Sequence, residues 1–402
     1  MRICCPTYWY PEHKGDIHAT YVHDINRHIV KHGHHVTVIT PRVGKGSKKE
    51  VYDSVNILRF NLKVPYELSY GKIAQGGKHS SVKKLWTMFL YIAKTFYHTF
   101  RTCRKQKIEV IHAHWAIPSG FPAVLVSKLL SIPCFITMHG GDVYYNPKEG
   151  YDYPGKFYIR PFLRYTLRNA TKLTAITEDC KRHAINAGAF EKDIIVITNG
   201  ADLERFSPAQ KDKRLAMKFG LSDNAIFSCR QLIPRKGMRF LVGAMPEILN
   251  KFPDAKLVIA GDGVERPKLE KMIKDLKLNS KVFLVGWVKN EDLPKYYNSC
   301  DVAVMPSLEE GFGIPAAEAM GCGKPVVSTD AGGLVEVVED GVTGYIVRKG
   351  SSGELARGII KVLSDKNKAK EMGKSGRKRA LKLFSWDKTA KEFIKLYKQH
   401  IK

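Results

Sequence analysis

The sequence predicts an α/β protein with two domains, each built on a doubly wound parallel sheet. A chain of 402 residues is longer than one typical core, which indicates two domains of ordinary size. In both halves, short apolar runs alternate with stretches of helical periodicity, a pattern typical of parallel sheets covered by helices. We expect the first domain to cover residues 1–205 and the second to cover residues 206–384.

Composition and charge narrow the class of protein. Hydrophobic residues make up 44% of the chain, as in soluble globular proteins, and no apolar run approaches the ~20 residues of a membrane span. The start lacks the apolar core of a signal peptide, and eight cysteines without a Cys-x-x-Cys pair fit reduced thiols, so we expect a cytoplasmic protein. The net charge of +27 favours polyanionic partners, although a solvated lysine surface is the simpler explanation.

The first half opens with a βαβ unit. Arg2–Cys5 and His35–Thr40 are apolar runs typical of buried strands, and apolar residues between 19 and 30 recur at helical spacing. The loop after the first strand contains Gly15, at the edge where doubly wound sheets bind ligands. A missing side chain lets the backbone approach a phosphate or a sugar, but an ordinary turn glycine is an equally good interpretation.

A second strand end in the first half carries polar side chains. The apolar run Cys134–Met138 is followed directly by His139 and, after two glycines, by Asp142. At such a strand end a histidine can donate to a hydroxyl and an aspartate can accept from one. A lone histidine is more often structural, but two strand-end loops rich in His, Gly and Asp favour a ligand-binding role.

Residues 82–107 predict a basic helix with an aromatic face. Apolar side chains recur there at steps of three and four residues, namely Leu85, Phe89, Ile92, Phe96 and Phe100. Lys83, Lys84 and Trp86 lie at the start of this helix. Such a helix could lie on an anionic bilayer, and the alternative is a helix packed on the sheet with its lysines extended into water.

The second half places cations directly after a strand. The strand Ala225–Cys229 is followed by Arg230, and Lys236 and Gly237 close the same short segment. Past a strand end and opposite a helix N-terminus, an arginine fork and a lysine point charge are what a diphosphate needs. Further apolar runs that end in glycine turns indicate a second doubly wound sheet.

The next motif predicts a strand, a glycine turn and a helix N-terminus. Asp301–Met305 is the strand, Glu310–Gly313 is the turn, and Pro315 suits the first position of a helix. Backbone N–H groups and the helix dipole make such a place an anion site. Glu310 and Glu318 frame it, which suggests a ligand with phosphate and hydroxyl groups, such as a nucleotide-sugar. An ordinary turn with two solvated acids is the alternative.

Taken in order along the chain, these motifs resemble the family 4 glycosyltransferases of the GT-B fold. Arg230, Lys236 and two glutamates separated by seven residues fit this family. So do five further segments: His139–Asp142, Asn199–Asp202, Ala260–Gly263, Gly286–Val288 and Gly341–Gly344. The resemblance implies two Rossmann-like domains facing a cleft, and a C-terminal helix at residues 385–402 that packs back on the N-terminal domain.

The resemblance also assigns roles to individual residues. Arg230 and Lys236 are expected to neutralise the donor diphosphate, and Glu318 to hold the ribose hydroxyls. Glu310 and His139 are the expected catalytic residues at the transferring sugar. The other donor contacts are expected at Gly15, Val288, Gly311, Phe312, Gly313 and Ile314. The acceptor or membrane side is expected at Lys83, Lys84, Trp86 and Asp142.

The implied activity is a retaining transfer of a hexose-type sugar from a UDP- or GDP-linked donor to a glycan, lipid-linked or small-molecule acceptor. No cofactor is expected, and the absence of Asp-x-Asp argues against a metal-bridged diphosphate. We expect an enzyme of polysaccharide or glycolipid synthesis, cytoplasmic or peripheral at the inner face of an anionic membrane, with no nucleic-acid partner.

Two other classes of protein stay open at this point. One is a GT-B-type nucleotide-sugar epimerase or hydrolase, and the other is a basic protein that binds nucleic acid or membrane. Two positions also depart from the family pattern, because Lys14 precedes Gly15 and Cys229 precedes Arg230 where glycines are common. The first departure leaves open the geometry of the loop that contains Gly15.

Overall fold

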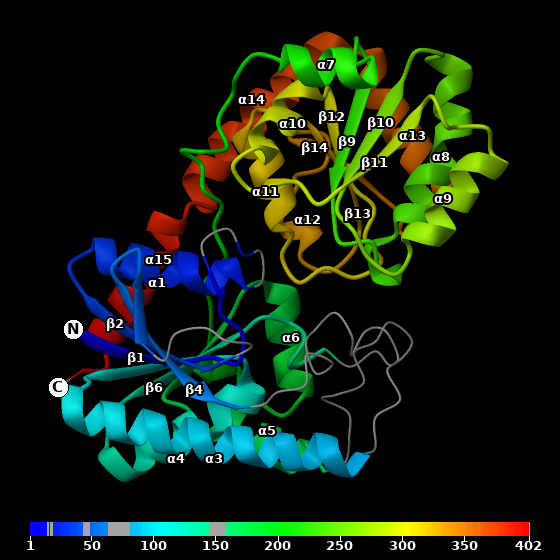
Figure 1. The fold of residues 1–402 in the computed structure, drawn as a ribbon. Coiled ribbons are helices and arrows are strands. Elements are labelled where there is room, and N and C mark those ends of the chain that lie inside the picture. Colours follow the sequence, from blue (N-terminus) through cyan, green and yellow to red (C-terminus); the bar gives the residue numbers. More distant parts are fainter. Residues whose placement is uncertain (14–15, 17–18, 43–48, 63–80, 145–157, 402) are drawn as a thin grey trace. The chain divides into compact units, whose positions relative to one another are not determined.

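A computed structural model describes residues 1–13, 16, 19–42, 49–62, 81–144 and 158–401, with side chains from Trp86 onward in the helix that begins at Ser81. The chain divides into two compact units (Figure 1). The first contains Met1–Thr198 together with Trp386–Lys402, and the second contains Asn199–Ser385. Each unit is an α/β structure built on one sheet, which confirms the predicted fold class.

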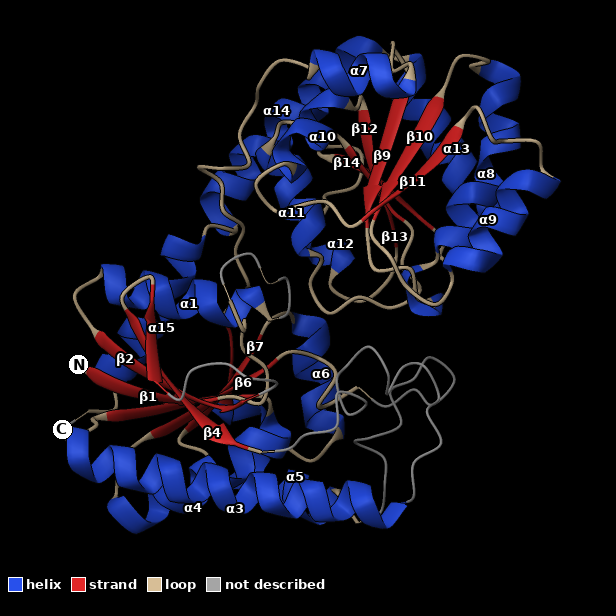
Figure 2. Cartoon of the chain, in the orientation of Figure 1, coloured by secondary structure: helices blue, strands red, loops and turns tan. Residues whose placement is uncertain are grey.

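The first unit is built on an eight-stranded sheet with the order β3-β4-β2-β1-β5-β6-β7-β8 (Figure 2). Neighbouring strands are parallel except for the antiparallel pair β3 and β4. The strands are β1 (Arg2–Pro6), β2 (His35–Arg42), β3 (Lys49–Tyr52), β4 (Val55–Asn61), β5 (Val110–His114), β6 (Cys134–Met138), β7 (Lys172–Ala175) and β8 (Ile194–Val196). The strand order reverses direction at β1 and β5, where doubly wound sheets bind ligands.

Helices cover both faces of this sheet. α1 (Thr20–Lys31) and α15 (Trp386–Lys398) lie on one face, and α3 (Ser81–Gln106), α4 (Phe121–Leu130) and α5 (Arg160–Asn169) lie on the other (Figure 1). The shorter elements are η2 (Ala116–Gly120), α6 (Glu178–Asn186) and η5 (Glu191–Asp193). The C-terminal helix α15 is held by buried Phe393 and Tyr397, and the Tyr397 hydroxyl is hydrogen-bonded to Nδ1 of His112 at 2.7 Å.

The second unit is built on a six-stranded parallel sheet with the order β11-β10-β9-β12-β13-β14. Its strands are β9 (Ala225–Cys229), β10 (Lys256–Ala260), β11 (Val282–Gly286), β12 (Val302–Met305), β13 (Val326–Thr329) and β14 (Gly344–Val347). Its helices are α7 (Lys213–Phe219), η6 (Pro234–Lys236), α8 (Met238–Lys251), α9 (Arg266–Asp275), α10 (Leu293–Ser299), α11 (Ile314–Gly321), α12 (Leu334–Val337), α13 (Ser352–Ser364) and α14 (Lys366–Leu383).

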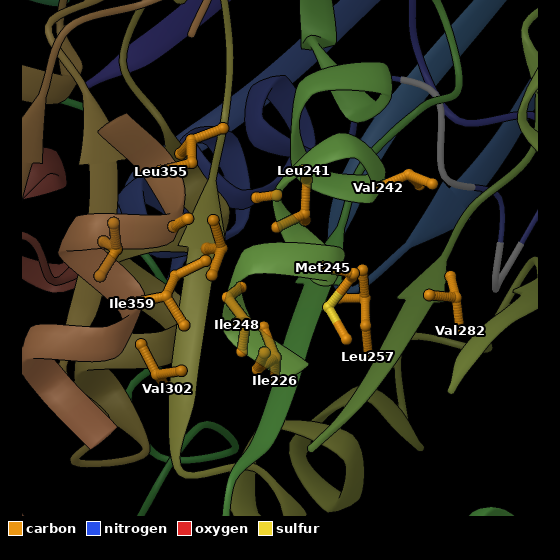
Figure 3. Close-up of a cluster of buried hydrophobic side chains, with 14 of the residues drawn as sticks. Ile226, Leu241, Val242, Met245, Ile248, Leu257, Val282, Val302, Leu355 and Ile359 are labelled. Atoms are coloured by element: carbon orange, nitrogen blue, oxygen red, sulfur yellow. The ribbon is translucent and has the colours of Figure 1, made fainter. Parts of the chain in front are cut away.

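The core of the second unit lies between the sheet and helices α8 and α13 (Figure 3). Leu241 of α8, Ile359 of α13 and Leu257 of β10 are fully buried there. Burial of a leucine or isoleucine side chain contributes ~1.5–3 kcal/mol, so this contact fixes both helices on the sheet. The strands of the same sheet end in the loops that carry the candidate site.

The structure adds elements that the sequence patterns do not predict. The hairpin β3–β4 and the strand β14 were not expected, whereas α3 agrees with the helix predicted over residues 82–107 to within one residue at each end. The side chains of β3 are exposed or half-buried, so this strand lacks the continuous apolar run of a buried parallel strand. Of the helices described, none is long and apolar enough to cross a bilayer.

Candidate functional site

Three charged side chains meet where two neighbouring strands of the second unit end. Arg230 follows β9 directly, and Lys236 closes the short 3-10 turn η6 that comes next. Glu310 lies in the loop after β12, the strand that pairs with β9. The order of this sheet reverses direction between these two strands, and such a reversal is where open α/β sheets bind ligands.

One carboxylate oxygen joins the three side chains. The Lys236 Nζ lies 2.9 Å from Oε2 of Glu310, and Nη1 of Arg230 lies 3.3 Å from the same oxygen. The hydroxyl of Ser307 also donates to it, at 3.2 Å. The side chains of the two cations are only 4% and 13% exposed, yet the Nε and Nη2 atoms of Arg230 have no partner among the described residues. Buried N–H donors without partners are rare, so these two nitrogens are candidates to donate to an anion.

The charges shift each other's pKa values. Burial opposes ionisation of Glu310, but the attraction of Lys236 and Arg230 is larger in sum and lowers the pKa of Glu310 to about 2. Burial lowers the pKa of Lys236 to about 8, with Glu310 acting in the opposite direction. At neutral pH the cluster therefore holds two cations and one carboxylate, with a net positive charge next to the start of α11.

Glycines let the backbone segments of this cluster approach each other. Gly237 has φ of 66°, and a Cβ atom built there would lie 2.0 Å from the carbonyl oxygen of Pro306. Gly261 has φ of 127°, and its Cβ would lie 1.9 Å from the carbonyl oxygen of Arg230. Any side chain at either position would clash with backbone. The Ala260–Gly263 motif therefore supports the segment that carries Arg230, whose N–H donates to the carbonyl of Ala260 at 2.9 Å.

The remaining predicted donor residues lie in the same unit. Gly311, Phe312, Gly313 and Ile314 form the turn into α11, with Phe312 buried and Gly313 at φ of 100°. Glu318 lies one turn into α11 and accepts from the Tyr297 hydroxyl at 3.3 Å. Val288 follows β11 and is half-buried beside exposed Trp287.

The other two predicted polar residues, His139 and Asp142, lie in the first unit after β6. Nε2 of His139 lies 2.9 Å from Nδ1 of His114, the last residue of β5. Burial lowers the pKa of His139 to about 3, so the ring is neutral. Asp142 accepts from the N–H groups of Ala116, at 2.7 Å, and His139, at 3.2 Å. Asp142 therefore holds this loop together.

Other predicted residues lie apart from these clusters or outside the described part of the chain. Gly15 lies outside the described residues, and Lys83 and Lys84 lie in α3 at positions whose side chains are not described. Trp86 is described and is 60% exposed on α3. Across the described ranges, no group of three or more His, Cys, Asp or Glu side chains is arranged to hold a metal ion.

Two contacts of the site were missed by the sequence analysis. Ser307 gave no signal, because a single serine after a strand is common in every α/β protein. His114 could have been found, since His112 and His114 are two residues apart on a predicted buried strand and therefore lie on the same face, where each needs a polar partner. Only the pairing of β5 with β6 brings His114 to His139.

Two family models match this chain. A model described as Glycosyltransferase Family 4 matches residues 18–205, and one described as Glycosyl transferases group 1 matches residues 210–379. An uncharacterised glycosyltransferase of Methanocaldococcus jannaschii is 30% identical over 294 residues, which are 73% of this chain and 76% of that protein.

Two further similarities come from a curated relative and a solved structure. A GDP-mannose-dependent alpha-(1-6)-phosphatidylinositol monomannoside mannosyltransferase of Mycolicibacterium smegmatis is 34% identical over 196 residues, 46% of this chain and 51% of that protein. Anabaena HepE in complex with UDP-glucose has a TM-score of 0.75 at 20% identity, with 99% of this chain and 100% of that chain covered.

The fold and these matches define a glycosyltransferase of the GT-B class. Within that class, the chain belongs to glycosyltransferase family 4. The resemblance found in the sequence is thereby confirmed, as is the expectation that the protein is an enzyme.

Proposed function

We propose that this enzyme moves a hexose-type sugar from a nucleoside-diphosphate donor to a glycan, lipid-linked or small-molecule acceptor, with retention of anomeric configuration and without a bound metal. One observation carries the proposal: Arg230 and Lys236 converge on a single buried carboxylate oxygen, and two guanidinium nitrogens are left without a partner among the described residues. A donor diphosphate is an anion of the right charge to occupy such a place.

The proposed donor contacts follow from this cluster. Arg230 and Lys236 neutralise the diphosphate, and Glu318 holds the ribose hydroxyls. Glu310 and the turn Gly311–Ile314 hold the sugar, while Val288 lies beside the base. In the first unit, His139 contacts the transferring sugar as a neutral hydrogen-bonding group, which agrees with the direction in which burial shifts its pKa.

The charges of the cluster suit the chemistry of glycosyl transfer. As the bond to the diphosphate breaks, the sugar becomes oxocarbenium-like and the leaving group gains negative charge. Cations held in place before the reaction stabilise that charge without reorganisation. Two cations already positioned for the diphosphate provide this stabilisation from side chains alone, which is the basis for proposing that no metal is needed.

Retention is proposed to proceed by front-face attack within an ion pair. A double displacement needs a carboxylate nucleophile beside the anomeric carbon. Glu310 is a poor nucleophile, because Lys236, Arg230 and Ser307 all engage its Oε2 atom and its pKa is about 2. Isolation of a covalent glycosyl-enzyme would contradict this part of the proposal.

One experiment tests the proposed transfer and also identifies the base and the sugar of the donor. The similar proteins include a GDP-mannose-dependent enzyme and a complex with UDP-glucose, so the donors tested include both nucleotides. Purified protein is incubated with UDP- and GDP-linked hexoses and a panel of lipid and glycan acceptors, with EDTA and with Mg²⁺. We expect acceptor-dependent release of nucleoside diphosphate at equal rates in both solutions, and a product with the anomeric configuration of the donor.

Matched variants connect the reaction to the cluster. Lys236→Ala and Arg230→Ala each remove a charge-assisted hydrogen bond worth ~1.5–3 kcal/mol, so donor affinity should fall roughly 10- to 100-fold. Lys271→Ala removes an exposed lysine of α9 in the same unit and should leave donor affinity unchanged. Equal affinity in all three variants, or nucleotide release that no acceptor accelerates, would contradict the proposed transfer.

A further inference from the structure

One face of the first unit's sheet is covered by helices that contain cations and no acids. α3, α4 and α5 contain six, one and three Lys or Arg residues, and none of the three contains Asp or Glu. They lie side by side on that face (Figure 1). On the opposite face, α1 and α15 carry six Lys or Arg residues together with three acids. Among the helices that cover the first unit's sheet, the excess of positive charge is therefore larger on the face of α3, α4 and α5.

Ion pairing sharpens this contrast. On α1 and α15, Arg27 pairs with Asp24 at 2.7 Å and Lys391 pairs with Asp387 at 2.7 Å. On the other face, no carboxylate of the described residues forms an ion pair with the cations whose side chains are described. These are Lys94, Arg101, Arg104, Lys105, Lys128, Arg160, Arg164 and Arg168. Their charge is free to attract an external anion.

Large apolar side chains stand among these cations. On α3, Trp86 and Phe89 are each 60% exposed and Tyr97 is 52% exposed. The rings of Trp86 and Phe89 are stacked, with their centroids 5.8 Å apart. On the neighbouring helices, Leu129 of α4 is 65% exposed and Phe162 of α5 is 47% exposed. We call the exposed side chains of α3, α4 and α5 the basic aromatic face. Large apolar side chains exposed among cations are typical of a surface that binds a partner or a membrane.

The aromatic residues at the start of α3 are not the ones that hold it on the protein. Tyr91, Thr95, Thr99 and Cys103 form its buried side, at helical steps of four residues. Phe89, which the periodicity of the sequence places on the apolar side, is exposed instead. Packing on the sheet therefore uses one side of α3, and Trp86 and Tyr97 lie on the exposed side, where their recorded contacts are to other residues of α3 itself.

We propose that the basic aromatic face binds the surface of an anionic phospholipid bilayer. Cations meet the phosphate headgroups, while Trp86, Phe89 and Leu129 enter the boundary between headgroups and acyl chains. Leu129 distinguishes this partner from a nucleic acid, because an aliphatic side chain inserts among lipids but cannot stack on a base. The proposal goes beyond sugar transfer and does not depend on the donor site, which lies in the second unit.

The test is flotation of the full chain with phosphatidylcholine vesicles that contain or lack phosphatidylglycerol. The wild-type protein should float with the anionic vesicles alone, and less at high salt because exposed charges are then screened. Substitution of Arg101, Arg104 and Lys105 by Gln should lower partitioning roughly 100-fold, at about fivefold per cation. The double variant Trp86→Ser, Phe89→Ser keeps every charge, and its partitioning onto the anionic vesicles should be lower than that of the wild type by roughly tenfold or more.

A charge-matched control separates this face from the overall charge of the protein. Lys370, Lys374 and Lys378 are exposed on α14 of the second unit, and their substitution by Gln removes the same charge. This control should float like the wild type. Equal losses in the α3 and α14 variants, or no flotation of the wild type, would overturn the proposal. So would tighter binding to RNA than to vesicles with no effect of the Trp86 and Phe89 substitutions.

Discussion

At the scale of single residues, Glu310 organises the cluster that it forms with Arg230 and Lys236, which we call the donor cluster after its proposed ligand. Its Oε2 atom holds Lys236 and Arg230 in place through the same oxygen, so the two cations converge before any donor arrives. In the proposed donor site, a diphosphate would have to share these cations with a carboxylate or displace it. Glu310 would then position the cations and compete with the donor phosphate at the same time.

Glu310→Gln separates these two roles. The amide keeps the size of the side chain but removes its charge, so Lys236 and Arg230 lose a competing anion. We expect nucleoside diphosphate to bind at least as tightly as to the wild type in calorimetric titration, while the rate of sugar transfer falls at least tenfold. A loss of diphosphate affinity as large as that of Lys236→Ala would show that Glu310 only holds the cations in place.

The pH dependence of donor binding is the second prediction at this scale. Lys236 attracts a diphosphate only with its proton bound, and burial lowers its pKa in the free protein to about 8. A bound diphosphate raises that pKa, so affinity is complete below about pH 8 and falls as pH rises through 8, up to tenfold per pH unit.

Lys236→Arg is the matched control for this titration, because arginine stays protonated throughout the range. Affinity for UDP or GDP is measured by calorimetry from about pH 7 to about pH 9.5, where only the wild type should weaken. A decline of the same size in Lys236→Arg would assign the titration to another group.

The sequence could predict which charged residues form the site but not how they meet. Arg230, Lys236 and Glu310 each follow an apolar run, and the reversal of strand order brings such strand ends together. The shared oxygen depends on the pairing of β9 with β12, which no local pattern contains. For the same reason, the contact of His114 with His139 depends on the pairing of β5 with β6.

At the scale of elements, close backbone approach fixes the loop that carries Lys236. η6 ends at Gly237, whose φ of 66° turns the chain into α8 against the carbonyl of Pro306. The carbonyl of Arg235 also accepts from the N–H of Leu308 at 2.8 Å. The loops after β9 and β12 are thus joined through backbone, and the distance between Lys236 and Glu310 follows from this junction.

Gly237→Ala should break this junction. The new Cβ would overlap a carbonyl oxygen that cannot rotate away, and the left-handed conformation adds ~1–2 kcal/mol of strain. We expect the second unit to unfold at lower denaturant concentration and nucleoside diphosphate to bind more weakly. Gly353→Ala, in the first turn of α13, has no neighbour closer than 3.8 Å and should be neutral or slightly stabilising. Similar stability for the two variants would refute the role of the junction.

A strand buried on both faces was predictable, and the exposed strand β3 was not. β6 is buried at every position and appears in the sequence as the apolar run Cys134–Met138. β3 alternates between exposed and half-buried residues and was missed. In α3 the periodicity of apolar residues predicted the helix correctly, and Ile92, Phe96 and Phe100 of the apolar stripe are half-buried. The fully buried side also contains Thr95 and Thr99, which apolar periodicity does not reveal.

At the scale of the whole molecule, the last helix, α15, packs on the sheet of the first unit and not on the sheet of the second unit, which precedes it in the chain. α15 follows α14 of the second unit, yet two of its side chains contact His112 of β5. The ring centroids of His112 and Phe393 are 4.7 Å apart, and the Tyr397 hydroxyl lies 2.7 Å from Nδ1 of His112. The sequence pattern shows an amphipathic helix but does not say which sheet it covers. Only the family resemblance places it on the first domain.

Phe393→Ala tests this division of the molecule into two units. Phe393 is 1% exposed, and loss of a buried phenylalanine costs ~3–5 kcal/mol, a large share of the stability of a unit of this size. Hydrogen exchange measured by mass spectrometry should show faster exchange in β1, β5 and β6 and unchanged exchange in the peptides of the second unit. Nucleoside diphosphate affinity should stay within twofold of the wild type, because the donor cluster lies entirely in the second unit.

Lys395→Ala is the control for this experiment, since Lys395 is exposed on the same helix. Surface substitutions of this kind change stability by ~0.5 kcal/mol or less, so its exchange should match the wild type in both units. The division would be wrong if Phe393→Ala accelerated exchange equally in β9 and β12, because α15 would then support the donor cluster as strongly as it supports the sheet it covers.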